Sequence, residues 1–222
     1  MAINRSAERA ALSVAEIQLA RVASEGCARH PHLQALVEAS GRDAGRDLSD
    51  AVHLLCSLHG HYPGLIELAL QRCPSGPAES WLLRASEAFE RERLYLVRLT
   101  SAVGPLPSTP GAAETEASLQ GARRALETLA QSERQGCALG SATALVGDWW
   151  PIRRVLDRAA ARAGVEAPAP SLPDEASVVD VIESLVSPAG GRALAFGGEQ
   201  LLLQHRALFD LLEARAEARS DY

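Results

Sequence analysis

Apolar residues recur every three or four positions through most of this sequence, which is the spacing of one face of an α-helix. The first such stripe consists of Leu12, Ala15, Leu19 and Val22. The chain contains 40 alanines and 32 leucines, which favour helices, but only 5 isoleucines, 3 tyrosines and 3 phenylalanines. The β-branched and aromatic residues typical of strands are therefore scarce. The sequence predicts an all-α protein.

Glycine, proline and capping residues indicate where the helices begin and end. The helices expected from these signals cover residues 6–25 with Ser6 as N-cap, a short segment after Pro31, a segment bearing Leu48 to Leu58, a short segment starting at Pro63, and residues 77–101, 113–146, 148–159, 174–185 and 201–212. Asp148 and Asp174 are expected N-caps. Residues 188–198, which contain four glycines, are expected to form a loop.

The two longest expected helices, 77–101 and 113–146, are joined by the Pro- and Gly-rich loop 104–111. They predict an antiparallel spine with several shorter helices packed around it, that is, a helical bundle. We expect a single all-helical domain over residues 1–222, with a C-terminal subregion, 174–222, after a Pro-rich linker.

Charge and cysteine usage narrow the classes of function. All 22 basic residues are arginine, which excludes lysine Schiff-base chemistry and a P-loop that depends on lysine. The net charge of −6 argues against nucleic acid and anionic membranes as partners. No apolar run is long enough to span a bilayer, and no signal peptide is expected at the start. Four widely spaced cysteines suit reduced thiols, so the expected location is the cytoplasm of a bacterium.

The candidate ligand-binding residues are ionisable side chains on apolar helix faces. Glu92 and Glu133 each lie seven residues, nearly two turns, from small or apolar residues of the same face, and His205 lies among leucines of the last helix. Buried carboxylates and imidazoles are costly unless they are paired or bind a ligand. Two carboxylates and one imidazole suit a divalent metal or a small ligand, with Trp149 and Trp150 as lids.

The hairpin geometry supports an alternative for these carboxylates. At equal heights on the two long helices, Glu92 lies level with Arg123, and Glu133 lies about 15 Å further along the axis. A Glu92–Arg123 ion pair is the simpler interpretation. If Glu133 faces inward and meets an arginine or His205, Glu133→Ala is expected to cost about 3–5 kcal/mol. Glu133 is then the most constrained ionisable residue of the chain.

Histidines and cysteines suggest a second, weaker metal hypothesis. Cys27 and the neighbouring histidines could hold zinc with His59 and His61. This requires residues 41–45 to be a hairpin turn, because a kinked continuous helix would place the two groups about 40 Å apart. His53 is a further candidate, but the Glu-x-x-His pairs of di-iron bundles are absent, since the nearest match is Asp50 with His53. No cofactor is required by any complete motif.

Several segments together resemble an uncharacterised helical protein family of sphingomonad-type alphaproteobacteria, a domain of unknown function. The similarity covers about residues 50–165 and is carried by residues 58–64, by Glu92-Arg93-Leu94-Tyr95-Leu96, by residues 104–111 and by residues 132–140. The resemblance implies no activity. It implies only that Glu133 and a small-residue stripe belong to a shared feature.

The stripe consists of Gly136, Gly140, Ala144 and Gly147, which suits close helix packing in the monomer or in a homodimer, or a pocket wall. No complete nucleophile, metal or phosphate motif is present. We therefore expect a non-catalytic binding, interaction or regulatory protein, with a protein partner, self-association or a small ligand as the binding event. The alternative is a metal- or small-ligand-binding bundle, ferritin-like in general architecture, with its site at Glu92, Glu133 and His205.

Overall fold

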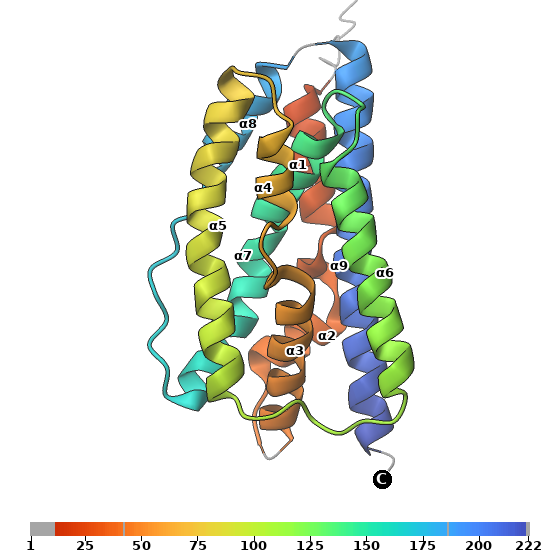
Figure 1. Cartoon of the computed structure of the whole chain (residues 1–222). Helices are drawn as coiled ribbons and strands as arrows, with labels where there is room; N and C mark the ends of the chain where they lie inside the picture. The colour runs from red at the N-terminus through yellow and green to blue at the C-terminus, as the bar shows by residue number, and fades with distance from the viewer. Residues whose placement is uncertain (1–11, 42, 186, 221–222) are drawn as a thin grey trace, which may run out of the picture.

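The chain folds into a bundle of α-helices (Figure 1) in the computed structural model, which describes residues 12–41, 43–185 and 187–220. The elements are α1 (Val14–Glu25), the 3-10 turn η1 (Cys27–Arg29), α2 (Pro31–Glu38), α3 (Ala44–His59), α4 (Leu65–Gln71), α5 (Pro77–Ala102), α6 (Ala112–Ala130), α7 (Cys137–Ala163), α8 (Glu175–Glu183) and α9 (Pro188–Ser220). These described residues contain no strand, so the all-α prediction is confirmed.

The helices α7 and α9 pack against each other more extensively than any other pair of helices in the described residues. Glycines let their backbones touch. A Cβ atom added at Gly140 would lie 2.0 Å from the carbonyl oxygen of Leu194, and one added at Gly197 would lie 2.0 Å from that of Cys137. The predicted small-residue stripe therefore packs inside the protomer. The homodimer prediction was based on this stripe, so the stripe no longer supports it.

The glycine-rich segment 188–198 is the first part of α9, so the predicted loop is wrong. Glycine costs about 1 kcal/mol relative to alanine inside a helix. At Gly197 the close approach of α7 offsets that cost, since only a residue without a Cβ fits against the carbonyl oxygen of Cys137. Glycine was interpreted as a helix breaker where the structure uses it for packing.

Residues 113–146 form parts of two helices, not one. The chain turns between Ala130 and Cys137, where Gly136 has a left-handed φ of 97°. Helix α7 then continues through Asp148 and Pro151 to Ala163, so Asp148 is an interior residue rather than the predicted N-cap. The predicted spine is wrong for the same reason: its second long helix ends at Ala130.

Other boundaries agree more closely with the sequence. The helix α5 matches its prediction, and Asp174 caps α8 by accepting the N–H of Ser177 over 2.9 Å. Helix α1 begins at Val14 with Ser13 as its N-cap, and the predicted cap Ser6 lies outside the described residues. Helix α4 begins after Gly64, not at Pro63 as predicted.

A turn separates α2 from α3, as the hairpin alternative required. Gly41 in this turn has a φ of 91°, a left-handed conformation that favours glycine. The chain thus reverses, and α2 and α3 lie against each other (Figure 1). The alternative of one kinked helix over residues 31–59 is wrong.

One apolar core runs through the bundle. It includes side chains from the first described helix to the last, among them Ala15, Leu55, Leu96, Trp149 and Leu201. None of the helices in the described part of the chain is long and apolar enough to cross a membrane. The polar groups enclosed by this core are the ones that need an explanation.

Candidate functional site

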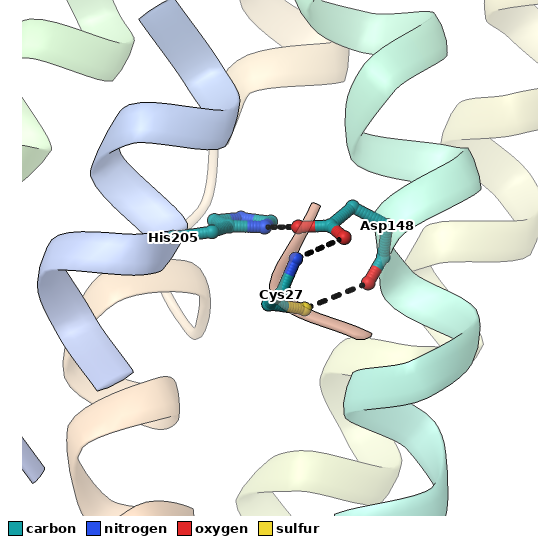
Figure 2. Close-up of side chains that lie close together, drawn as sticks. All are labelled: Cys27, Asp148 and His205. Carbon is teal, nitrogen blue, oxygen red and sulfur yellow. Dashed lines mark hydrogen bonds and ion pairs between the residues drawn. The ribbon is translucent and has the colours of Figure 1, made fainter. Parts of the chain in front are cut away.

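Three polar side chains from distant parts of the chain meet inside the bundle (Figure 2). Asp148 comes from α7, His205 from α9 and Cys27 from η1. Nδ1 of His205 lies 2.7 Å from Oδ2 of Asp148, and the backbone N–H of Cys27 donates to Oδ1 over 2.8 Å. His205 is 0% exposed and Asp148 is 1% exposed. Each carboxylate oxygen of Asp148 therefore has a hydrogen-bond partner, as burial demands.

His59, the last residue of α3, extends this cluster. Its Nε2 lies 3.0 Å from Nε2 of His205, and the two rings are nearly perpendicular. Burial, together with His205 and Arg93, lowers the pKa of His59 well below its usual value of 6.5. His59 is therefore neutral at pH 7, and a proton on one of the two Nε2 atoms joins the rings. We refer to these residues as the Asp148–His205–His59 chain.

The cluster also contains donor atoms that metals bind. One such atom from each of Cys27, Asp148 and His205 lies within 4.8 Å of the others. However, the Cys27 thiol is 3.5 Å from the carbonyl oxygen of Asp148, which it can reach as a donor. Burial and the nearby carboxylate raise the pKa of this thiol far above its usual value. Because a metal binds the thiolate, this set fits a hydrogen-bonded network better than a metal centre.

Glu92 contacts α7, not α6. Its carboxylate accepts the indole N–H of Trp149 over 3.0 Å and a guanidinium N–H of Arg153 over 2.6 Å. The predicted Glu92–Arg123 pair is wrong, because it assumed that residues 113–146 form one helix beside α5. Arg123 contacts His61 instead.

Trp149 connects Glu92 to the Asp148–His205–His59 chain. Its indole is 0% exposed and lies edge-on to the His59 ring, with the ring centroids 5.3 Å apart. Two of the predicted site residues, Glu92 and His205, therefore lie in one buried polar region with Trp149 and His59 between them.

Glu133 does not lie with them. It is exposed in the turn between α6 and α7, so its predicted inward position is wrong. The heptad pattern that placed it there needs a continuous helix, which the turn interrupts. Glu133 borders a separate cavity of about 530 Å³. Trp150 is 41% exposed and borders a third cavity, of about 390 Å³, beside Gly147.

The three histidines proposed as metal ligands do not come together. Nε2 of His53 lies 2.8 Å from the carbonyl oxygen of Gly104. His61 contacts Arg123, and only His59 reaches the central cluster. The hairpin condition of the zinc hypothesis is met, but these ligands are dispersed.

A cavity of about 550 Å³ opens beside His59, and we call it the His59 cavity. Its mouth includes Arg123, Arg124 and Glu127 of α6. Its buried lining is apolar and comes from α3, α4, α5, α6 and α7: Leu58, Leu65, Phe89, Leu126 and Leu145. His59 is thus an imidazole placed among apolar side chains.

A buried ion pair holds the segment 61–64, which forms one wall of the cavity. Arg93 donates to both carboxylate oxygens of Glu67, over 2.8 and 2.9 Å. Glu67 also accepts the backbone N–H of Gly64 over 2.7 Å, and the guanidinium of Arg93 lies 5.5 Å from the centre of the Tyr62 ring. These contacts hold the segment 61–64 in place, so this wall of the cavity is fixed by the Arg93–Glu67 pair.

Sequence reasoning missed Asp148 and the Arg93–Glu67 pair. A usable signal existed for Asp148, since it lies three residues after Leu145 and four before Ile152, on one helical face. Glu67 is three residues after Gly64, the acidic position of a capping box at the start of α4. Assigning Asp148 as a cap removed it from the candidate list.

Fold and site together define an all-helical protein with a buried carboxylate–imidazole chain beside a cavity. The chain belongs to DUF6975, a family of unknown function, whose model matches residues 22–220. The predicted membership in a domain of unknown function is confirmed, and the match is wider than the predicted residues 50–165. The sphingomonad origin stays a prediction. No curated protein and no solved structure matches the chain.

Proposed function

We propose that this protein is a non-catalytic binding protein that takes a small amphipathic molecule into the His59 cavity. The observation that carries the proposal is a cavity of about 550 Å³ with a buried apolar inner wall and a polar mouth, in which the imidazole of His59 is oriented by buried partners on two other helices. Small-molecule sites typically measure about 300–1,000 Å³ and combine apolar walls with a few placed polar groups.

The lining indicates the chemistry of the ligand. The buried leucines and Phe89 suit an apolar body, and His59 offers one hydrogen-bonding position. At the mouth, Arg123 pairs with Glu116, and Arg124 is the cation that favours a negative group at the outer end of the ligand.

A small ligand is a better-supported occupant than a protein partner. The stripe that suggested helix association packs against α9 within the protomer, with Gly140 against Leu194. The alternative site of Glu92, Glu133 and His205 has less support, because Glu133 is exposed and borders another cavity.

The test is binding of 1-anilinonaphthalene-8-sulfonate, a probe with aromatic rings and one anionic group, followed by its fluorescence. We expect saturable binding to the wild type. Leu68→Trp should weaken it by about tenfold or more, or about 1.4 kcal/mol, because Leu68 lines the cavity and the indole fills it. The matched control is Leu83→Trp, at a position 50% exposed on α5 and outside this lining.

This probe also binds partly unfolded protein. Circular dichroism and thermal melting are therefore needed to check that both variants are folded. Equal affinity of the two tryptophan variants would place the probe elsewhere and refute the proposal. So would a wild type that does not bind the probe.

A further inference from the structure

One end of the Asp148–His205–His59 chain lines a cavity, which distinguishes it from a purely internal network. Nε2 of His59 contacts His205. No hydrogen bond joins Nδ1 of the same ring to any residue in the described ranges. His59 is 6% exposed and borders the His59 cavity. The ring thus connects the buried carboxylate to the space where a ligand would lie.

The hydrogen-bond donors and acceptors define a protonation state for the Asp148–His205–His59 chain before a ligand binds. A neutral His205 that donates through Nδ1 to Asp148 has no proton on Nε2. The 3.0 Å contact is then a hydrogen bond donated by Nε2 of His59. Nδ1 of His59 therefore carries a free lone pair. In this state the ring, which borders the cavity, has an acceptor atom to offer a ligand.

Adding one proton at Nδ1 of His59 produces a second, equally well-bonded state. His59 passes its Nε2 proton to Nε2 of His205, across the existing 3.0 Å contact. The positive charge then lies on His205, whose Nδ1 is 2.7 Å from the carboxylate of Asp148. A buried carboxylate stabilises an imidazolium in this arrangement.

We propose that His59 accepts a proton from the ligand in the His59 cavity, and that this ligand carries an ionisable hydroxyl, of the phenol or enol class, on an apolar body. This inference rests on the proposed function, since the cavity must be occupied. The O–H bond of the ligand breaks and an N–H bond forms at Nδ1 of His59. The N–H bond at Nε2 of His59 breaks, and one forms at Nε2 of His205. The ligand becomes an oxyanion, and His205 becomes a cation.

The surroundings of His59 favour this route. Burial, His205 and Arg93 all lower the pKa of His59, whereas the carboxylate of Asp148 lies 2.7 Å from Nδ1 of His205, where it stabilises a positive charge. Arg93 itself is paired with the carboxylates of Glu67 and Glu90. The charge therefore separates, with the cation deep in the bundle and the anion in the cavity.

The acidity of the ligand's ionisable group favours a hydroxyl over a carboxylic acid. A carboxylic acid is already ionised at pH 7 and has no proton to give, since its pKa is about 4. A phenol, with a pKa near 10, is neutral in water and can lose its proton where the oxyanion is stabilised. The apolar lining suits the ring of such a molecule.

The experiment uses 4-nitrophenol, whose anion is yellow and whose neutral form is not. The pH is set so that the free probe is mostly neutral. We expect the absorbance of the anion to rise in proportion to bound probe, and no proton to be released to an unbuffered solution. Unchanged absorbance overturns the proposal. A rise with one proton released per bound probe also overturns it, because the proton then went to solvent rather than to the chain.

Variants locate the acceptor. Asp148→Asn removes the charge that stabilises His205 as a cation, and His59→Gln removes the acceptor while keeping an N–H donor. Each should lower the ionised fraction of bound probe by about tenfold. The matched control is His53→Gln, a histidine of the same helix that contacts Gly104 and should leave this fraction unchanged. An unchanged fraction in Asp148→Asn and His59→Gln overturns the proposal.

If a buried variant does not fold, ¹⁵N spectra of the wild-type histidine rings supply the same answer. The probe should convert His205 to the doubly protonated form, and an unaltered His205 overturns the inference. The anilinonaphthalene probe carries no such hydroxyl. If it binds while 4-nitrophenol binds without ionising, the proton-transfer inference fails and the proposed function stands. If neither probe binds, both fail.

Discussion

Two buried aspartates contact α9 and differ in what balances their charge. Asp50 is 0% exposed and accepts hydrogen bonds from the guanidinium groups of Arg215 and Arg219. Asp148 is 1% exposed, and its partners are an imidazole and a backbone N–H. Asp50 is neutralised by permanent cations. The protonation of the group beside Asp148 can change, and its far end reaches a cavity, which is the arrangement expected of a functional site.

The Asp50 cluster has a structural explanation. Arg215 donates to Thr115 of α6 as well as to Asp50 of α3, and Arg219 donates to Thr109 of the loop between α5 and α6. The cluster thus ties the last turns of α9 to three other parts of the bundle. Its polar groups are satisfied within the protein.

The largest expected effect comes from breaking the Asp50 cluster. Asp50→Leu leaves the charge of Arg215, a residue 4% exposed, without its carboxylate. We expect a loss of about 3–5 kcal/mol in the free energy of unfolding, measured by urea denaturation at pH 7. Binding of the anilinonaphthalene probe per folded molecule should not change. Both results follow if this cluster is structural only.

The matched control for that change is Asp47→Asn. Asp47 pairs with Arg219 at a side chain 28% exposed, so its loss should cost less than about 1 kcal/mol. Equal losses for Asp50→Leu and Asp47→Asn would show that burial does not distinguish the two pairs.

The next effect concerns the placement of His205 beside Asp148. In Gly197→Ala the new methyl group meets the carbonyl oxygen of Cys137, so α9 must move away from α7. We expect a loss of about 1–3 kcal/mol from overpacking, measured by thermal melting. Gly197 lies about two turns before His205, nearer than Arg215 does, so the histidine contact should be disturbed first. Ring ¹⁵N shifts of His205 report that disturbance.

Gly121→Ala is the control for helix propensity. Gly121 lies in α6, and a Cβ there meets no atom within 4 Å. This change should stabilise the protein by up to about 1 kcal/mol. If Gly197→Ala also stabilises it, the close approach of α7 and α9 is not required.

The sequence predicted helix content well and helix partners poorly. Apolar spacing found α5 and the inward face that carries His205, because both depend on local periodicity. The same method did not identify Asp50 as a buried residue, because spacing compares a residue only with others of its own helix. The structure surrounds α3 on several sides, so Asp50 is buried. Which helix covers a polar residue is a long-range property.

Glycine caused the other errors. Residues 188–198 look like a loop by propensity, yet they are helical because α7 approaches them at backbone distance. At Gly136 the opposite holds, since its left-handed φ lies in the turn that separates α6 from α7 inside a segment predicted to be one helix. Local propensity cannot separate these two uses. The segment that packs against each glycine determines whether that glycine lies in a helix or in a turn. The amino-acid sequence alone does not reveal that segment.

Lowering the pH should reduce the stability of the protein through His59, in the region of Asp148, and not through the Asp50 cluster. The pKa of His59 is lower in the folded protein than its usual value of 6.5, so below pH 6.5 the unfolded chain binds more protons. Stability is therefore complete above that pH and falls as pH drops toward the folded pKa, by up to about 1.4 kcal/mol per unit. Urea denaturation at about pH 7.5 and about pH 5.5 measures this loss.

His59→Gln should flatten that pH dependence, whereas Asp50→Leu should lower stability at both pH values and keep the slope. His32, whose pKa burial also lowers, adds a smaller slope of the same sign. His32→Gln therefore removes only part of the effect. Parallel curves for the wild type and His59→Gln would contradict the assignment of the titration to His59.

The smallest change in stability is expected for Glu133→Ala, and Glu92→Ala serves as its comparison. Glu133 is exposed in the turn between α6 and α7, so Glu133→Ala should change stability by less than about 0.5 kcal/mol. Glu92 is 2% exposed, and Glu92→Ala leaves the indole N–H of Trp149 without its acceptor and removes one of the two carboxylates at Arg153, at a cost of about 1–3 kcal/mol. Urea denaturation of both variants measures the difference. A loss above about 1 kcal/mol for Glu133→Ala would contradict its exposed position. Because the same helical period placed both glutamates inward, their difference isolates what the turn between α6 and α7 does to Glu133.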